Sequence, residues 1–469
     1  MKFGTDGWRG IIADDFTFDN VRICARAVAE YLKDMGQTKK ELVIGYDTRF
    51  ASEDFAVAAA EVIAAFGIKV YLCTAATPTP VISYGTVAMK AGGAIIITAS
   101  HNPAAWNGFK VKSENGASVS SEVTIKIEEN VTRLINSKPP ESILLDESLK
   151  KGLVEYVDLL PSYMEQISQL VSLDEIKNSG LKVIVDPMYG AGSGYLKNLL
   201  SDGSTEIIEI NCERNPLFPG IQPEPIQPNL EKLIETVREQ KGSVGIATDG
   251  DADRLGIVDE YGNFISTLQV LSLLTYYLLE ARGERGLVVK TINTSVMMDR
   301  LAEIYGVKVI EKPVGFKHIA PFLMNDALIG GEESGGYGFR GHLPERDGIL
   351  AALYFLDLMV KTGKTPSQLL DHLFSITGTH HYNRIDVHFP SDERDNIINR
   401  VKNFPAEKIN GITVGEINTI DGFKYIMTDG SWLIIRFSGT EPLLRIYAES
   451  STPQMVEELL QAGKKLAGI

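Results

Sequence analysis

The sequence predicts a protein of the α/β class, with three consecutive α/β/α layered domains followed by a C-terminal α+β domain. Three observations support this prediction. The chain has 469 residues, which is too long for one hydrophobic core. Short β-branched segments alternate with segments of helical periodicity, as is typical of mostly parallel sheets covered by helices. The alternation starts again twice along the chain, and a strand-rich pattern follows its last cycle.

The first domain should hold two helices and three strands. We expect the helices over 18–35 and 55–66, alternating with strands over 42–46, 69–72 and 92–97. The last of these strands is short, rich in isoleucine and nearly uncharged, so we expect it to be buried.

The second and third domains repeat this alternation. A helix over 157–171 should lead into a strand over 181–186, and a proline-rich loop follows over 216–228. The third cycle contains a strand over 286–290 and a helix over 350–359.

A change of character marks the C-terminal domain. We interpret residues 378–389, where His380 and His381 stand beside strand-like residues, as a linker into it. The expected domains are therefore 1–150, 151–262, 263–378 and 379–469.

Composition limits the class of protein. A net charge of −15 argues against nonspecific nucleic-acid binding, although charges are screened within about 8 Å, so a phosphate substrate remains compatible. Three scattered cysteines indicate a reducing compartment. The N-terminus has no apolar signal core, and no apolar stretch approaches the ~18 residues of a membrane span. We expect a cytoplasmic protein with no nucleic-acid or membrane partner.

A serine at the end of a buried strand is the first candidate for chemistry. Ser100 follows the strand 92–97, and Pro103 forces a turn because it lacks an N–H and biases Asn102 away from helix. Ligand crevices of α/β sheets lie at the carboxyl ends of strands. The alternative is an ordinary Ser/Asn turn.

Three aspartates at alternate positions form the second candidate. Asp249, Asp251 and Asp253 lie between two apolar strands and could converge on one hard cation. An EF-hand is excluded because Arg254 replaces the required glycine and the flanking segments are strands. A solvated acidic turn is the remaining alternative.

Two glycine-flanked loops complete the set. In 330–336, Glu332 and Ser334 should point to the same side of an extended stretch, which suits adjacent sugar hydroxyls. In 436–442, an arginine, two hydroxyls and free loop amides make a phosphate cradle, with a polar hairpin turn as the alternative. The residues of that cradle are Arg436, Ser438, Gly439 and Thr440, with Arg445 as a further cation.

In their order along the chain these loops match a known pattern. The chain resembles the α-D-phosphohexomutase family, which includes the phosphoglucomutases and phosphomannomutases, over essentially its whole length. The resemblance implies four domains around a central cleft, each contributing one loop. The matching segments are 3–10, 98–103, 107–110, 249–254, 331–335 and 436–442.

The resemblance also implies roles for individual residues. Ser100 would be the phosphoserine that exchanges a phosphoryl group with the sugar, and its phosphate with the three aspartates would hold one Mg²⁺ per chain. Lys110 would be the general acid/base, and a cationic neighbourhood would lower its pKa. Catalytic support would come from Arg9 and His101. The substrate would contact Arg254, Lys317, Glu332, Ser334, Arg436, Ser438, Gly439, Thr440 and Arg445.

Substrate preference rests on few positions. Trp8, Glu333 and Gly336 are similar to glucose-preferring members, so we expect a phosphoglucomutase that uses glucose 1,6-bisphosphate as intermediate and activator. Phosphomannomutase or bifunctional glucose/mannose activity is the main alternative. Phosphoglucosamine mutase, a sugar-1,6-bisphosphate synthase and a silent sugar-phosphate sensor are others. A monomer and a homodimer are both compatible with the sequence.

Overall fold

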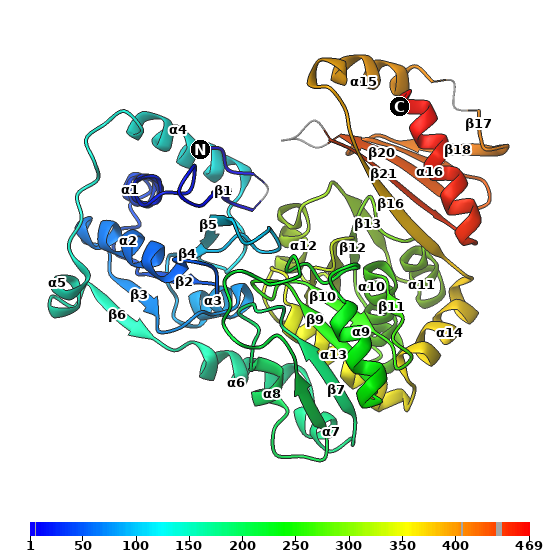
Figure 1. Ribbon diagram of the computed structural model, residues 1–469, viewed down its shortest axis with the longest axis horizontal. Coiled ribbons are helices and arrows are strands. Elements are labelled where there is room, and N and C mark those ends of the chain that lie inside the picture. Colours follow the sequence, from blue (N-terminus) through cyan, green and yellow to red (C-terminus); the bar gives the residue numbers. More distant parts are fainter. Residues whose placement is uncertain (5, 405–406, 438–442) are drawn as a thin grey trace.

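The computed structural model describes residues 1–4, 6–404, 407–437 and 443–469. It contains four main sheets, each made from one consecutive part of the chain. We call these parts units I to IV; they span 1–157, 160–265, 267–377 and 381–469. Figure 1 shows unit I, in blue, and unit IV, in orange and red, on opposite sides of the molecule with units II and III between them.

Unit I is a six-stranded sheet in the order β1-β5-β4-β2-β3-β6. The four strands β4, β2, β3 and β6 run parallel, and β5 and β1 add an antiparallel edge. Every residue of β2 and β4 is buried, because helices cover both faces. The strands are β1 (Trp8–Ile11), β2 (Leu42–Tyr46), β3 (Val70–Cys73), β4 (Gly93–Ile97), β5 (Trp106–Ser113) and β6 (Val154–Val157), and the helices are α1 (Phe18–Asp34), α2 (Ser52–Ala65), α3 (Thr79–Ala88), α4 (Ser121–Leu134) and α5 (Leu145–Lys150).

Strand β6 differs from the sequence prediction. It pairs with β3, so the first sheet extends beyond residue 150, and the helix expected over 157–171 begins later as α6 (Leu160–Leu170). This strand has only four residues, two of them exposed, because it lies at a sheet edge. In the sequence, such a segment has no apolar run that would mark it as a strand. Pro161, in contrast, fits the first turn of a helix, which is where α6 begins.

Unit II has a five-stranded sheet in the order β11-β10-β9-β7-β8. Strands β9 and β10 form an antiparallel hairpin whose connection is the aspartate segment 249–254. The expected strand over 181–186 is confirmed as β7. Besides α6, the elements are α7 (Leu173–Lys177), β7 (Lys182–Asp186), α8 (Tyr195–Leu199), β8 (Glu206–Glu209), α9 (Glu231–Gln240), β9 (Val244–Thr248), β10 (Leu255–Val258) and β11 (Phe264–Ile265).

Unit III has a four-stranded sheet in the order β13-β12-β14-β15, packed against the long buried helix α13. One hydrophobic core joins units I, II and III, with Val43, Val185, Leu255 and Leu353 among its members. The elements are α10 (Thr267–Tyr276), the π-helix η1 (Tyr277–Ala281), β12 (Val288–Thr291), α11 (Met297–Tyr305), β13 (Val309–Lys312), the 3₁₀-helix η2 (Phe316–His318), α12 (Ala320–Met324), β14 (Ile329–Gly331), β15 (Tyr337–Phe339), α13 (Gly348–Thr362) and α14 (Pro366–Thr377).

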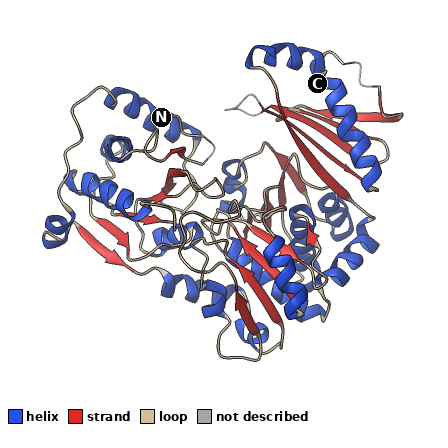
Figure 2. Cartoon of the chain, viewed as in Figure 1, coloured by secondary structure: helices blue, strands red, loops and turns tan. Residues whose placement is uncertain are grey.

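Unit IV is an antiparallel sheet in the order β16-β21-β20-β19-β18-β17 with its own core. Figure 2 shows its helices, in blue, beside the red strands. The segment 378–389, expected as a linker, contains β16, whose polar alternating residues hide its strand character. The elements are β16 (His381–His388), η3 (Ser391–Glu393), α15 (Arg394–Lys402), β17 (Lys408–Ile409), β18 (Ile412–Asn418), β19 (Phe423–Met427), β20 (Trp432–Phe437), β21 (Leu443–Ser450) and α16 (Pro453–Ala467).

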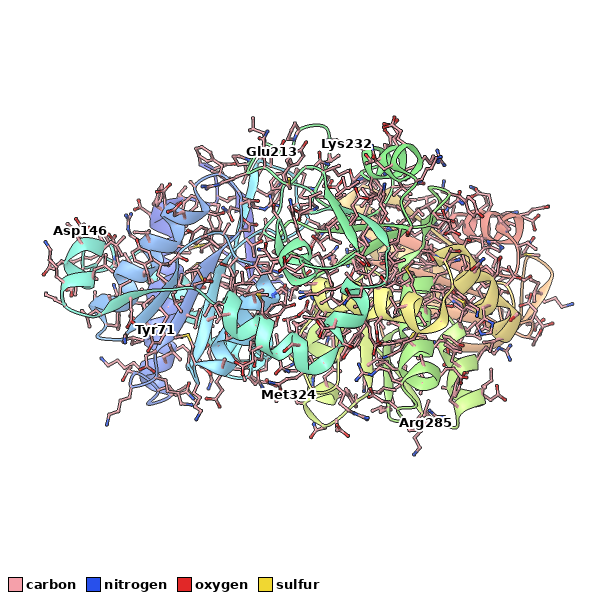
Figure 3. The ribbon with its side chains drawn as sticks, turned by 90° about the horizontal axis from the view of Figure 1, so that it is seen from below. Tyr71, Asp146, Glu213, Lys232, Arg285 and Met324 are labelled. Carbon is pink, nitrogen blue, oxygen red and sulfur yellow. The ribbon has the colours of Figure 1, made fainter. Side chains whose placement is uncertain are left out.

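The elongated arrangement is visible from a second direction. In Figure 3 the labelled Tyr71 and Asp146 lie with unit I at one end, whereas Arg285 of unit III lies towards the other end. Within the described parts of the chain, no helix combines the length and the apolar character that crossing a bilayer requires.

Candidate active site

Ser100 lies just beyond the carboxyl end of β4, as the sequence predicts. Its side chain is buried, and its Oγ donates a hydrogen bond to Asp249 Oδ2 at 2.7 Å. The backbone of Ser100 is left-handed, with φ at 53°, a conformation that costs energy for a residue with a side chain. Strain of this kind persists where the surroundings fix one orientation of a functional group. The serine of unit I is thereby aimed at the aspartate loop of unit II.

The three aspartates of that loop converge. Asp249, Asp251 and Asp253 are fully buried, and one carboxylate oxygen from each lies within 4.8 Å of the others. Asp251 Oδ1 and Asp253 Oδ1 are buried without a hydrogen-bond partner among the described residues. Arg254 follows directly, with Nε 3.8 Å from Asp249 Oδ2.

This donor set fits a divalent cation. Burial, and then the repulsion from the neighbouring Asp253 and Asp251, raise the pKa of Asp249 well above its ordinary value. A hard cation with oxygen ligands would relieve that repulsion and use the orphaned oxygens. The solvated acidic turn considered from sequence is thus wrong, because none of the three side chains is exposed.

Lys110, in β5, reaches the same loop. Its Nζ lies 2.8 Å from both Asp251 Oδ2 and Asp6 Oδ2, and the side chain is buried. Burial would lower the pKa of Lys110, but Asp251 and Asp6 outweigh burial and raise it. The expected cationic neighbourhood is therefore wrong for Lys110, because carboxylates far away in the sequence surround its ammonium group.

His101 and Arg9 lie beside the serine. His101 Nδ1 is 3.4 Å from Ser100 Oγ, and Arg9 Nη1 donates to Asn102 Oδ1 at 2.6 Å. Burial, and then Arg254 and Arg9, lower the pKa of His101 well below its ordinary value, so the imidazole is neutral. The structure thus brings Arg9 and His101 together with Ser100, as predicted.

The glutamate-serine loop of unit III is a hairpin turn between β14 and β15. Glu332 N donates to Gly336 O, and Gly335 N donates to Glu332 O, so the stretch is not extended as we expected. The glycine-rich sequence allows a turn as readily as an extended strand. Glu332 is buried and its Oε1 accepts from Gly315 N at 3.0 Å, whereas Ser334 is partly exposed.

Three predicted cationic side chains lie in units III and IV. Lys317 is in η2, two residues beyond Gly315, and thus beside the loop that holds Glu332. Arg436 and Arg445 occupy directly paired positions of β20 and β21 in unit IV. Arg436 Nε donates to Asp421 Oδ2 at 2.9 Å. The other predicted residues of that loop, Ser438, Gly439 and Thr440, lie outside the described residues.

Four family models match the chain in succession. They are the phosphoglucomutase/phosphomannomutase α/β/α domains I, II and III and the C-terminal domain of the same proteins, matching residues 1–138, 161–262, 268–376 and 393–463. The chain belongs to the phosphoglucomutase/phosphomannomutase family. It is therefore a phosphohexomutase, an enzyme of the isomerase class.

Similar proteins carry names for several hexose substrates. A phosphoglucomutase/phosphomannomutase of Thermococcus kodakarensis is 33% identical over 99% of this chain and 98% of its own length. A probable phosphoglucosamine mutase of Methanothermobacter thermautotrophicus is also 33% identical, over 96% of this chain and 94% of its own. The crystal structure of a putative phosphomannomutase from Thermus thermophilus is 35% identical, with a TM-score of 0.87 over 100% of this chain and 99% of that one.

The candidate site also contains residues that the sequence did not predict. Asp6 and Arg346 form an ion pair at 2.7 Å, and Arg346 Nη2 lies 2.9 Å from Asp253 Oδ2. Thr79 Oγ1 donates to Asp251 Oδ2 at 2.6 Å. Arg49 lies under the serine loop. The one available signal was the polar segment 47–49 directly after the buried strand 42–46, the same pattern that revealed Ser100.

Arg49 supports the serine loop through the backbone. Its guanidinium is fully buried, and Nη2 donates to Ser100 O and Asn102 O, both at 2.6 Å. Nη1 donates to Pro103 O at 2.9 Å, and Nε donates to Asp47 at 3.1 Å. One side chain thereby fixes three carbonyls of the turn that carries Ser100.

Arg49→Lys should impair this phosphohexomutase through kcat. A lysine keeps the charge but cannot donate to several carbonyls in a planar fork, so the serine should shift. We expect kcat to fall on the order of 100-fold with little change in KM, because small misplacements of reacting groups cost about that much. Steady-state kinetics below the melting temperature measure both constants. The exposed Arg214→Lys is the matched control, and an unchanged kcat in folded Arg49→Lys would contradict this role.

Proposed function

We propose that the protein is a Mg²⁺-dependent phosphoglucomutase that interconverts α-D-glucose 1-phosphate and glucose 6-phosphate. The observation that carries the phosphoryl-transfer chemistry is the contact of Ser100 Oγ with the buried aspartate triad, with Lys110 on its other side. Phosphoryl transfer requires mainly positioning and charge stabilisation, which such a site supplies.

In the proposed cycle, Ser100 carries a phosphoryl group before substrate arrives. Its phosphate and Asp249, Asp251 and Asp253 would hold the Mg²⁺, which when bound stabilises charge on the transferring group. The free hydroxyl of the hexose phosphate attacks the phosphorus, and the bond from phosphorus to Ser100 Oγ breaks. Lys110, which its carboxylate neighbours keep as an ammonium, gives its proton to the departing Ser100 Oγ and takes up the proton of the sugar hydroxyl. Glucose 1,6-bisphosphate then turns over in the cleft and returns its other phosphoryl group to Ser100, while Lys110 protonates the departing sugar oxygen and takes up the proton of the Ser100 hydroxyl.

Glucose is the proposed hexose because of the sequence pattern at Trp8, Glu333 and Gly336. Gly336 packs directly against Arg346: a Cβ at this position would overlap the Arg346 side chain. Bifunctional glucose/mannose members usually have histidine there, and a histidine would displace Arg346 from its contacts with Asp6 and Asp253. This packing favours glucose over the bifunctional alternative.

A direct comparison of substrates tests this assignment. Glucose, mannose and glucosamine 1-phosphates should be offered at equal concentration, with Mg²⁺ and a trace of the matching bisphosphate. We expect glucose 1-phosphate to turn over at least about tenfold faster, since a few matched polar contacts give discrimination of that size. Faster turnover of mannose or glucosamine 1-phosphate would overturn the substrate assignment. Turnover only with an outside phosphoryl donor would instead indicate a bisphosphate synthase.

A further inference from the structure

Adjacent glutamates of the hairpin turn between β14 and β15 face different units. Glu332 bonds within unit III, to Gly315 N. The side chain of Glu333 instead faces unit IV, where its Oε1 accepts from Tyr382 Oη at 2.6 Å and lies 3.1 Å from Arg384 Nη1. Glu333 is largely buried, with its side chain 11% exposed. It is thus an ion-paired contact between two units.

The Glu333 carboxylate is tightly held. Its Oε2 lies 3.4 Å from Arg384 Nη1 and 3.5 Å from Asn293 Nδ2, and its backbone carbonyl accepts from Thr267 Oγ1 at 2.5 Å. Burial, and then Glu333, raise the pKa of Tyr382 well above its ordinary value, so the phenol remains a donor. An acceptor engaged in this way has little capacity left for a sugar hydroxyl.

The contact continues towards the arginines of unit IV. Arg384 Nε lies 3.8 Å from Asp386 Oδ1, and Asp386 Oδ2 lies 3.7 Å from Arg445 Nε. Arg445 is paired with Arg436 across β20 and β21. Charges of alternating sign therefore run from the hairpin turn, which would grip the sugar, as far as Arg445, one of the two arginines that would hold its phosphate.

We propose that Glu333 is a positioning residue that fixes the distance between the sugar subsite of unit III and the phosphate subsite of unit IV, through Tyr382 and Arg384. The proposal rests on the phosphohexomutase function proposed above. A ligand held at two subsites gains full affinity only when their separation is already correct, since reorganising them costs binding free energy. Glu333 then acts on substrates that span both subsites, without touching the sugar itself.

Binding measurements with Glu333→Gln test the proposal. Each variant is made in full-length Ser100→Ala protein, so that bound ligand is not converted, and Kd is measured by calorimetry with glucose 1-phosphate and with inorganic phosphate. We expect Kd for glucose 1-phosphate to rise about tenfold, the size of effect typical for loss of one charge-assisted hydrogen bond. Kd for inorganic phosphate should stay within about twofold, because phosphate occupies one subsite only.

A second variant and a control sharpen the result. Tyr382→Phe removes one hydroxyl and should raise Kd for glucose 1-phosphate in the same direction but less. In the double variant, the increase in Kd should be smaller than the product of the two single increases, because both changes break the same contact. Glu239→Gln, at an exposed position of α9, should leave both Kd values unchanged.

Two outcomes would overturn the proposal. One is an unchanged Kd for glucose 1-phosphate in both Glu333→Gln and Tyr382→Phe. The other is an equal loss of affinity for both ligands, which would indicate a general disturbance of unit IV. If the Ser100→Ala parent binds mannose 1-phosphate and not glucose 1-phosphate, the substrate assignment fails, and the same comparison with mannose 1-phosphate still tests Glu333.

Discussion

Ser100→Ala is expected to abolish mutase turnover while leaving hexose phosphate binding nearly intact. The hydroxyl is the proposed attachment point of the phosphoryl group, and its Oγ, 2.7 Å from Asp249, is directed at the aspartate triad. Removing a nucleophile costs on the order of 10⁴- to 10⁶-fold in kcat. The methyl group of alanine is smaller than the hydroxymethyl group it replaces, and the loop keeps the carbonyl bonds to Arg49, so the fold should be retained.

Two measurements check this expectation. A coupled assay gives kcat, and intact-protein mass spectrometry should find one phosphoryl group on the wild type and none on Ser100→Ala. Ser168→Ala, at an exposed serine of α6, serves as the matched control and should behave as wild type. Turnover within about tenfold of wild type in Ser100→Ala would end the phosphoserine proposal, because loss of a true carrier cannot be so mild.

Asp251→Asn is expected to cause the second-largest loss of mutase activity. It removes the charge that Lys110 Nζ contacts at 2.8 Å, and it leaves a single side-chain oxygen to serve both the proposed cation and the Thr79 hydroxyl. We expect the Mg²⁺ concentration for half-maximal activity to rise on the order of 100-fold, since replacing even an outer partner of a metal ligand costs about 10- to 100-fold in affinity. The remaining activity should fall as well, because Lys110 loses a positioning contact.

A Mg²⁺ titration of activity after treatment with a chelator checks this prediction. Asp202→Asn is the matched control, because Asp202 is exposed and its left-handed backbone, with φ at 67°, accommodates asparagine well. A Mg²⁺ titration of Asp251→Asn that superimposes on the wild type would show that the aspartate loop does not hold the cation.

The serine, aspartate and glutamate loops were predictable from sequence because the residues that mark each loop are close together in the chain. Ser100 follows a buried apolar strand, and the three aspartates stand between two such strands, so a short window of sequence contains the whole pattern. The loop that carries Glu332 was found in the same way, although we expected an extended stretch and the structure has a hairpin turn.

The supporting contacts were not predictable, because they join distant parts of the chain. Asp6 and Arg346 are 340 positions apart, and Lys110 and Asp251 are 141 apart. No local pattern reveals such a pairing, so the sequence wrongly predicted a lowered pKa for Lys110, whereas its carboxylate partners raise it. The edge strands β6 and β16 were missed or misread for a related reason, since an edge strand shows no continuous apolar run.

The distribution of the cores has a consequence for how the molecule loses its structure. One core cluster joins units I, II and III, and units I and II each have a further cluster of their own. Unit IV has a separate core and meets unit III through a small apolar cluster around Ile292 and Trp432 and through ion pairs such as that of Glu333. Apolar packing therefore ties units I, II and III to one another through a larger cluster than the one that ties unit IV to unit III. We therefore expect unit IV to open locally at a lower free energy than units I to III, and such an opening would leave the serine, aspartates and lysine, which all belong to units I and II, in place.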